Sequence, residues 1–321
     1  MRVKLGLLSV ALGCWSLLAA CSGYGSPGML STLPESAAQK LSVVNAASPD
    51  HHRRHRPLKE LVIADPILGE LMIFDDTYHQ TGSISVPVPV GAWVDASENA
   101  YAASPSFGSG VSVTEYNKAG SLIFTYNNTS VTDPINVATD TKGNVYVASS
   151  GTSGASVVEY PQSSNIPINS CYTGLNNSGI AVDGKGDVFV SGDNPSTNAG
   201  ELVEYKQGLS GCKITLLGAV LGSAGGLQLD NKGDLVACDQ SVGVDIIPPP
   251  YSSISKTITV SGASDYHADA LNARSTKLFV VDSGVDEVYV LSYPGGSLLK
   301  TLGPSNGLYR PSGIATYPFE R

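Results

Sequence analysis

A ten-residue phrase that recurs along the chain constrains its fold more than any other feature. Its clearest copies read Asp-x-Lys-Gly-Asn/Asp followed by an apolar run, and they cover Asp140–Ser149, Asp183–Gly192 and Asp230–Asp239. The first aspartates stand 43 and 47 residues apart. Repeats of this length are typical of solenoids, propellers and arrays, because a single unit cannot bury its apolar face alone.

Partial copies extend the series to six. Val94–Ser104 and Asn272–Asp282 occupy the neighbouring slots upstream and downstream. The sixth copy is divided between the ends of the chain, since Leu61–Asp65 matches only the second half of the phrase and Gly313–Thr316 matches only the first half. Together, the two segments make up one complete copy of the phrase.

Each unit predicts four antiparallel strands. An apolar run leads to the Lys-Gly turn, where glycine supplies the positive φ of a hairpin, and a β-branched and aromatic strand follows. A variable loop then precedes a third strand that repeats a Val-x-Glu-Tyr pattern, as in Val113–Tyr116 and Val157–Tyr160, and a weaker fourth strand. The sequence therefore predicts an all-β, six-bladed β-propeller, closed by a C-terminal strand at about 313–317 that joins the blade starting near residue 61.

The N-terminus has the features of a lipoprotein signal peptide over residues 1–20. Arg2 and Lys4 precede an apolar run too short to span a bilayer. Leu18-Ala-Ala-Cys21 resembles the lipobox of bacterial lipoproteins, so we expect Cys21 to be acylated and to anchor the protein to a membrane. An ordinary signal peptide and an uncleaved anchor are the alternatives. Ser22 favours the outer membrane or cell surface over the inner membrane, in an extracytoplasmic, cell-envelope location.

Residues 21–57 are interpreted as a lipidated flexible tether, and residues 58–321 as the propeller domain. The tether is rich in Ser, Pro, Ala and Gly. Its basic run His51–Arg56 fits a solvated linker better than a metal or anionic-lipid site. The chain carries 19 Lys and Arg against 28 Asp and Glu, a net charge of −9, which argues against a nucleic-acid partner.

Three cysteines fall within the predicted propeller. Cys171 and Cys212 lie near the start of the fourth strand in neighbouring units, so a disulfide is conceivable, but free buried thiols are the favoured interpretation. Cys238 occupies a core position of a second strand. No disulfide is needed for a domain of this size.

A candidate site lies on the face that carries the loops between second and third strands together with the segments leading into each first strand. We term this the loop face, and the face with the Lys-Gly turns the turn face. The loop face varies between units, as binding surfaces on repeat scaffolds do. One lead-in segment there contains a histidine where its counterparts have Pro or Ser. The candidate binding funnel comprises His267, Asp265, Tyr266, Asp269, Asp239, Asp282, Arg310 and Trp93.

This funnel could be polar, or it could hold a divalent cation. The alternative is that His267 is a hydrogen-bonded packing residue and the carboxylates cap turns. The Asp-x-Lys-Gly-Asp turns themselves offer too few oxygens for calcium.

The three clearest copies of the phrase, with Gly179-Ile-Ala-Val-Asp183 leading into the second, resemble NHL-repeat propellers and the related SMP-30/gluconolactonase-like and virginiamycin B lyase-like proteins. The resemblance covers about residues 58–318. The gluconolactonase group implies a central divalent metal held by Glu, Asn and Asp, and neither Glu60 nor Glu70 lies in a matching motif. The lyase group implies a catalytic histidine, for which His267 is available.

Two functions follow from these patterns. The favoured one is a lipid-anchored, non-catalytic binding or scaffold module for a protein, peptide or glycan. Its support is the lipobox, the tether and the lack of Gly-x-Ser-x-Gly, His-Glu-x-x-His and Cys-x-x-Cys motifs. The alternative is a metal-dependent lactone hydrolase or lyase that uses His267 and Asp269. A purely structural envelope protein is a third interpretation.

Overall fold

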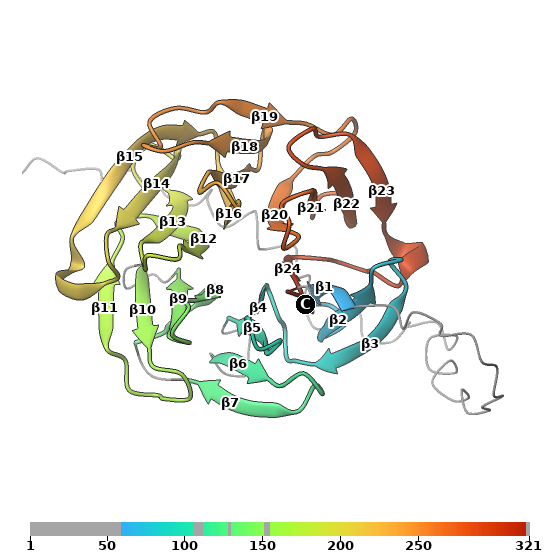
Figure 1. The fold of residues 1–321 in the computed structure, drawn as a ribbon, viewed down its shortest axis with the longest axis horizontal. Helices are drawn as coiled ribbons and strands as arrows, with labels where there is room; N and C mark the ends of the chain where they lie inside the picture. Colours follow the sequence, from blue (N-terminus) through green and yellow to red (C-terminus); the bar gives the residue numbers. More distant parts are fainter. Residues whose placement is uncertain (1–58, 106–111, 128–129, 151–154, 319–321) are drawn as a thin grey trace, which may run out of the picture. The chain divides into compact units, whose positions relative to one another are not determined.

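The computed structural model describes residues 59–105, 112–127, 130–150 and 155–318. These residues form six four-stranded antiparallel sheets, arranged as blades around a common central axis (Figure 1). We refer to the region along this axis as the channel. The prediction of an all-β, six-bladed propeller is confirmed. The predicted signal peptide, Cys21, the tether and His51–Arg56 lie outside the described residues.

In every blade one strand borders the central channel and the other three follow it outward. From the centre outward, blade 1 contains β24 (Gly313–Thr316), β1 (Lys59–Asp65), β2 (Glu70–Asp75) and β3 (Gln80–Ser85), and blade 2 contains β4 (Gly91–Val94), β5 (Ala100–Ser104), β6 (Ser112–Tyr116) and β7 (Leu122–Tyr126). Blade 3 contains β8 (Pro134–Thr139), β9 (Val145–Ser149), β10 (Ser156–Tyr160) and β11 (Asn169–Tyr172), and blade 4 contains β12 (Asn176–Val182), β13 (Val188–Asp193), β14 (Gly200–Tyr205) and β15 (Ile214–Leu221). Blade 5 contains β16 (Ala224–Leu229), β17 (Leu235–Asp239), β18 (Gly243–Ile247) and β19 (Lys256–Ile258), and blade 6 contains β20 (Tyr266–Leu271), β21 (Lys277–Asp282), β22 (Glu287–Ser292) and β23 (Leu298–Leu302). Two 3-10 turns, η1 (Ser210–Cys212) and η2 (Pro304–Asn306), lie between strands.

The repeated phrase builds the hairpin between the first two strands of a blade. Oδ1 of Asp183 accepts hydrogen bonds from the backbone N–H groups of Lys185 and Asp187, both at 2.8 Å. Gly186 has a φ of +87°, in the left-handed region that glycine adopts without strain. The same bonds recur at Asp140 and Asp230. The phrase is thus a turn-forming device, which explains its uniformity.

The Val-x-Glu-Tyr pattern of the third strands supplies buried acceptors within the blades. Glu115 is fully buried on β6 and accepts hydrogen bonds from the Tyr126 hydroxyl at 3.0 Å and the Asn99 amide at 3.2 Å. Glu159 on β10 accepts from the Tyr146 hydroxyl at 3.0 Å in the same way. A buried carboxylate is tolerated only when it is hydrogen-bonded, so these glutamates are structural.

The ring closes between the two ends of the propeller sequence. β24 pairs antiparallel with β1 from Leu61–Thr316 to Ala64–Gly313, as the split repeat predicts. Ile314 and Leu61 belong to one apolar cluster with residues of blade 6. The Lys277 ammonium of blade 6 also donates to the Glu60 carboxylate of blade 1, at 3.0 Å. Closure therefore combines strand pairing, apolar packing and an ion pair.

Cys171 and Cys212 form a disulfide, so the favoured interpretation of free thiols was wrong. The strand β15 starts only at Ile214, and the preceding turn η1 carries Cys212 toward β11, with 5.3 Å between the two Cα atoms. The bond links blade 3 to blade 4 across 41 residues. Cys238 is a free, buried cysteine, as expected for a core position.

Removing this disulfide should destabilise the propeller. We expect the double variant Cys171→Ser/Cys212→Ser to lose about 2–4 kcal/mol of unfolding free energy, because the bond restricts the unfolded chain over a long loop. Denaturant unfolding measures this loss. Reductant should lower the stability of the unmodified protein and leave the double variant unchanged, and an equal response of both would contradict the assignment.

Candidate functional site

Most aspartates on the loop face hold the backbone in place. Asp65, at the end of β1, accepts hydrogen bonds from the N–H groups of Tyr309 and Arg310, both at 2.8 Å. Asp282, at the end of β21, accepts in the same way from Ser264 at 2.8 Å and Asp265 at 3.1 Å. Each carboxylate thereby fixes the segment that leads into the first strand of its own blade.

Asp239 fixes the lead-in segment of blade 5 in the same way. It lies at the end of β17 and accepts from the N–H groups of Gly222, Ser223 and Ser241. Of the predicted funnel residues, Asp239 and Asp282 therefore use their carboxylates to hold the backbone of the lead-in segments. They act as turn caps, the alternative that the sequence left open.

His267 lies at a bulge near the start of β20, where the register shifts between Tyr266 and Ala268. Bulges redirect side chains and are common beside functional sites. Burial lowers the pKa of the half-buried imidazole, the nearby Asp265 carboxylate opposes this, and the Arg310 guanidinium lowers the pKa further. His267 is consequently neutral at neutral pH.

The structure thus brings together three of the predicted residues, His267, Asp265 and Arg310, at the loop-face end of the channel. Asp265 accepts a hydrogen bond from the Ser283 hydroxyl, which orients the carboxylate. Tyr266 is instead buried in the core of blades 5 and 6, where its hydroxyl accepts from the N–H of Val260 at 2.8 Å.

Asp269 is buried between blades 5 and 6. It is 2 % exposed, and neither carboxyl oxygen has a hydrogen-bond partner. A Cβ on Gly226 would lie 2.7 Å from Oδ1 of Asp269, so only glycine leaves room for this side chain. Burial raises the pKa of Asp269 to about 8, while the neighbouring Cys238 thiol opposes this shift. The carboxyl is mostly protonated at neutral pH, which makes it a poor metal ligand.

The predicted acidic residues do not converge on one point. Across the described ranges, no group of three or more His, Cys, Asp and Glu side chains is placed to hold a metal ion. Asp239 and Asp282 hold the backbone, and Asp269 is enclosed between blades. The described residues therefore contain no set of ligands for the divalent-cation site that the sequence suggested.

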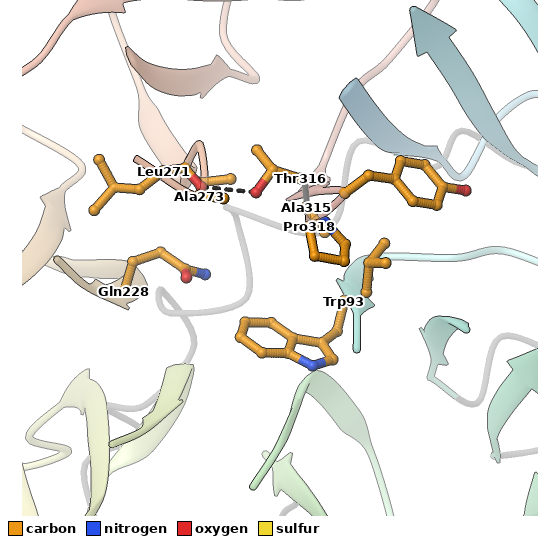
Figure 2. A pocket seen from close by; sticks show the side chains of 10 residues that line it. Trp93, Gln228, Leu271, Ala273, Ala315, Thr316 and Pro318 are labelled. Carbon is orange, nitrogen blue, oxygen red and sulfur yellow. Dashed lines mark hydrogen bonds between the residues drawn. The ribbon is translucent and has the colours of Figure 1, made fainter. Parts of the chain in front are cut away.

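Trp93 lies at the opposite end of the channel from His267, contrary to its predicted place in the funnel. β4 spans only Gly91–Val94, so Trp93 is close to its C-terminal end on the turn face. There it borders a cavity of about 200 Å³, which we call the turn-face pocket. Residues lining this pocket include Trp93, Gln228, Leu271, Ala273, Thr316 and Pro318 (Figure 2).

The sequence analysis missed the turn-face pocket, although the repeats contain a signal for it. Two residues before the first position of the turn, four units have alanine: Ala138, Ala181, Ala270 and Ala315. The two exceptions are Trp93 and Gln228, and both line the pocket, together with Ala270 and Ala315. Departures from the repeat would have identified it.

Comparisons with known proteins agree on the architecture alone. No protein-family model and no curated protein matches the chain. A solved structure of a nidogen/laminin complex matches with a TM-score of 0.64 at 16 % identity, covering 80 % of this chain and 98 % of the other. A protein of unknown function from Bacteroides caccae matches with a TM-score of 0.62 at 12 % identity, covering 81 % and 99 %.

The chain is a six-bladed β-propeller. Hydrazine synthase from Kuenenia stuttgartiensis shares the fold more distantly, with a TM-score of 0.52 at 13 % identity over 81 % of this chain and 92 % of the other. At these sequence identities, structural similarity supports a shared fold but not a shared activity. The function must be argued from the propeller's own surfaces.

The buried carboxyl of Asp269 predicts a pH-dependent stability. The folded propeller binds a proton there up to about pH 8, whereas the unfolded chain releases it above about pH 4, so the free energy of unfolding should fall as pH rises between these values. From pH 5 to 7 the Asp269 contribution should decrease by about 2–3 kcal/mol. Asp269→Asn should remove this contribution.

Denaturant unfolding at several pH values measures the difference between the two proteins. Asp76 is exposed, and Asp76→Asn should keep the pH profile of the unmodified protein. Parallel profiles for Asp269→Asn and the unmodified protein would contradict the assignment.

Proposed function

We propose that this protein is a lipid-anchored, extracytoplasmic binding module that captures a protein, peptide or glycan on its loop face. The observation that supports this proposal is that the loop face combines variable loop sequences with lead-in segments whose backbone is held by aspartate side chains. Asp65, Asp193, Asp239 and Asp282 all bond the N–H groups of lead-in segments. Lead-in segments held in this way lose little conformational entropy on binding.

The mouth of the channel supplies the polar anchor of this surface. His267 offers a neutral imidazole, and Arg310 and Asp286 lie close enough for the guanidinium charge to influence both His267 and Asp286. Mixed donors and acceptors of this kind suit a polar or glycan ligand.

The proposed location rests on two features of the chain. The lipobox-like Leu18-Ala-Ala-Cys21 motif supports acylation and the tether supports display away from a membrane. The Cys171–Cys212 disulfide is of the kind that persists in oxidising compartments outside the cytoplasm. Among the described residues, no helix has the length and apolar character needed to cross a membrane.

Acylation at Cys21 is testable directly. Cells fed a radiolabelled fatty acid should label the full-length protein, and Cys21→Ser should abolish the label and shift the protein from the membrane to the soluble fraction. Cys238→Ser, which changes a cysteine enclosed in the core, serves as the matched control and should keep the label. Persistent labelling of the Cys21 variant would overturn the proposed anchor.

Ligand binding on the loop face can be tested with a glycan array and a random peptide library. We expect selected ligands to bind the double variant Arg310→Ala/Asp286→Ala at least about tenfold more weakly, because both charges border the channel mouth. Lys185→Ala/Lys232→Ala alters the turn face and should bind normally. Equal binding to all three proteins would place the ligand elsewhere.

The alternative function remains a metal-dependent lactone hydrolase or lyase with His267 as general base. Its support is the neutral imidazole beside Asp265, because a base must be unprotonated at its working pH. Turnover on a panel of lactones that needs a stoichiometric divalent ion and disappears in His267→Ala would favour this enzyme over the binding module.

A further inference from the structure

The turn-face pocket lies where the innermost strands of four blades end. Trp93 comes from β4, Gln228 from β16, the Leu271 backbone from β20 and Thr316 from β24. Figure 2 shows the indole ring of Trp93 directed into the hollow, with Gln228 on one side and Thr316 and Pro318 on the other. The cavity therefore depends on the assembled ring and not on any single blade.

The repeat pattern indicates that the walls of this pocket are specialised. Four of the six units have alanine at the position of Trp93, and two of these alanines, Ala270 and Ala315, also line the pocket. A tryptophan and a glutamine replace the alanine in blades 2 and 5, and they lie on the same cavity. Trp93 also packs against the apolar clusters of blades 2–3 and 3–4, so its ring both contributes to blade packing and borders the cavity.

Trp93 presents a ring face rather than a hydrogen-bond donor. Its Nε1–H donates to the Thr139 hydroxyl at 2.9 Å, which fixes the indole and satisfies its polar atom. The Thr316 hydroxyl is similarly bonded to the Leu271 carbonyl, at 2.7 Å. Within the described chain, no hydrogen bond engages the Gln228 side-chain amide, which leaves one donor and acceptor group for a ligand.

We propose that the turn-face pocket binds a small, neutral aromatic molecule that stacks on Trp93 and hydrogen-bonds to Gln228. A volume of about 200 Å³ is below the range of drug-sized sites, which is roughly 300–1,000 Å³, so a single ring fits best. Aromatic rings gain from offset or edge contacts with an indole beyond simple burial.

The lining disfavours the other ligands that stack on tryptophan. A sugar brings several hydroxyl groups, but the polar side chains that line the pocket besides Trp93 are Gln228, Thr316 and Tyr317, so most of those hydroxyls would lose their hydrogen bonds to water. A charged ring would enter without an opposite charge, since the lining residues carry none. A phenol meets both conditions with one ring and one hydroxyl.

The chain has two tryptophans, Trp15 and Trp93, so a full-length Trp15→Phe variant reports on Trp93 alone. We expect 4-methylphenol to shift its single indole N–H resonance in a saturable manner, with a Kd below about 1 mM. Benzoate and methyl glucoside at the same concentrations should leave the resonance unchanged. This result is independent of ligand binding on the loop face.

Two variants assign the binding to the pocket by calorimetry. Ala273 is exposed at the rim, so Ala273→Phe should block the pocket without disturbing the core and weaken 4-methylphenol binding at least tenfold. Ala96→Phe makes the same change at the matching turn position of blade 2, outside the lining, and should bind normally. Gln228→Leu should weaken 4-methylphenol about fivefold and leave toluene binding unchanged.

The proposal is overturned by any of three results: no saturable shift with 4-methylphenol, an equal shift with benzoate or methyl glucoside, or unchanged binding in Ala273→Phe.

Discussion

Pairing between β24 and β1 is the interaction on which the rest of the propeller depends. Each blade buries both faces of its sheet against its neighbours, so an open seam would expose two apolar surfaces and one unpaired strand edge. The backbone bonds from Leu61 to Ala64 and the packing of Ile314 remove that seam. The channel, and both of its ends, exist only because the ring is closed there.

Acidic residues show how one side-chain type serves different purposes in this scaffold. Asp183 shapes a hairpin by accepting two backbone N–H bonds, and Asp282 holds a lead-in segment by the same chemistry. Asp269 has no such partner, and burial raises its pKa to about 8. These aspartates serve the structure of the propeller, so acidic residues alone do not mark a site.

Departures from the repeat mark the two ends of the channel. His267 interrupts the lead-in pattern at the loop face, while Trp93 and Gln228 interrupt the alanine pattern at the turn face. The other units build the same blade with the repeated residue, so a residue that breaks the pattern is a candidate for a binding role. The loop face and the turn-face pocket are thus separate candidates on one ring.

The sequence alone determined the number of blades, the four-stranded unit and the closure by the C-terminal strand, because turn chemistry and strand alternation act between residues close in the chain. It placed Asp265, His267 and Arg310 in a candidate funnel together with five other residues. The tertiary structure decided what depends on contacts between distant residues: the Cys171–Cys212 bond, the enclosure of Asp269 against Gly226, and the end of the channel reached by Trp93. Spacing along a repeat gives the blade to which a side chain belongs, but the direction of that side chain and the protonation of a buried acid are set by the neighbouring blade.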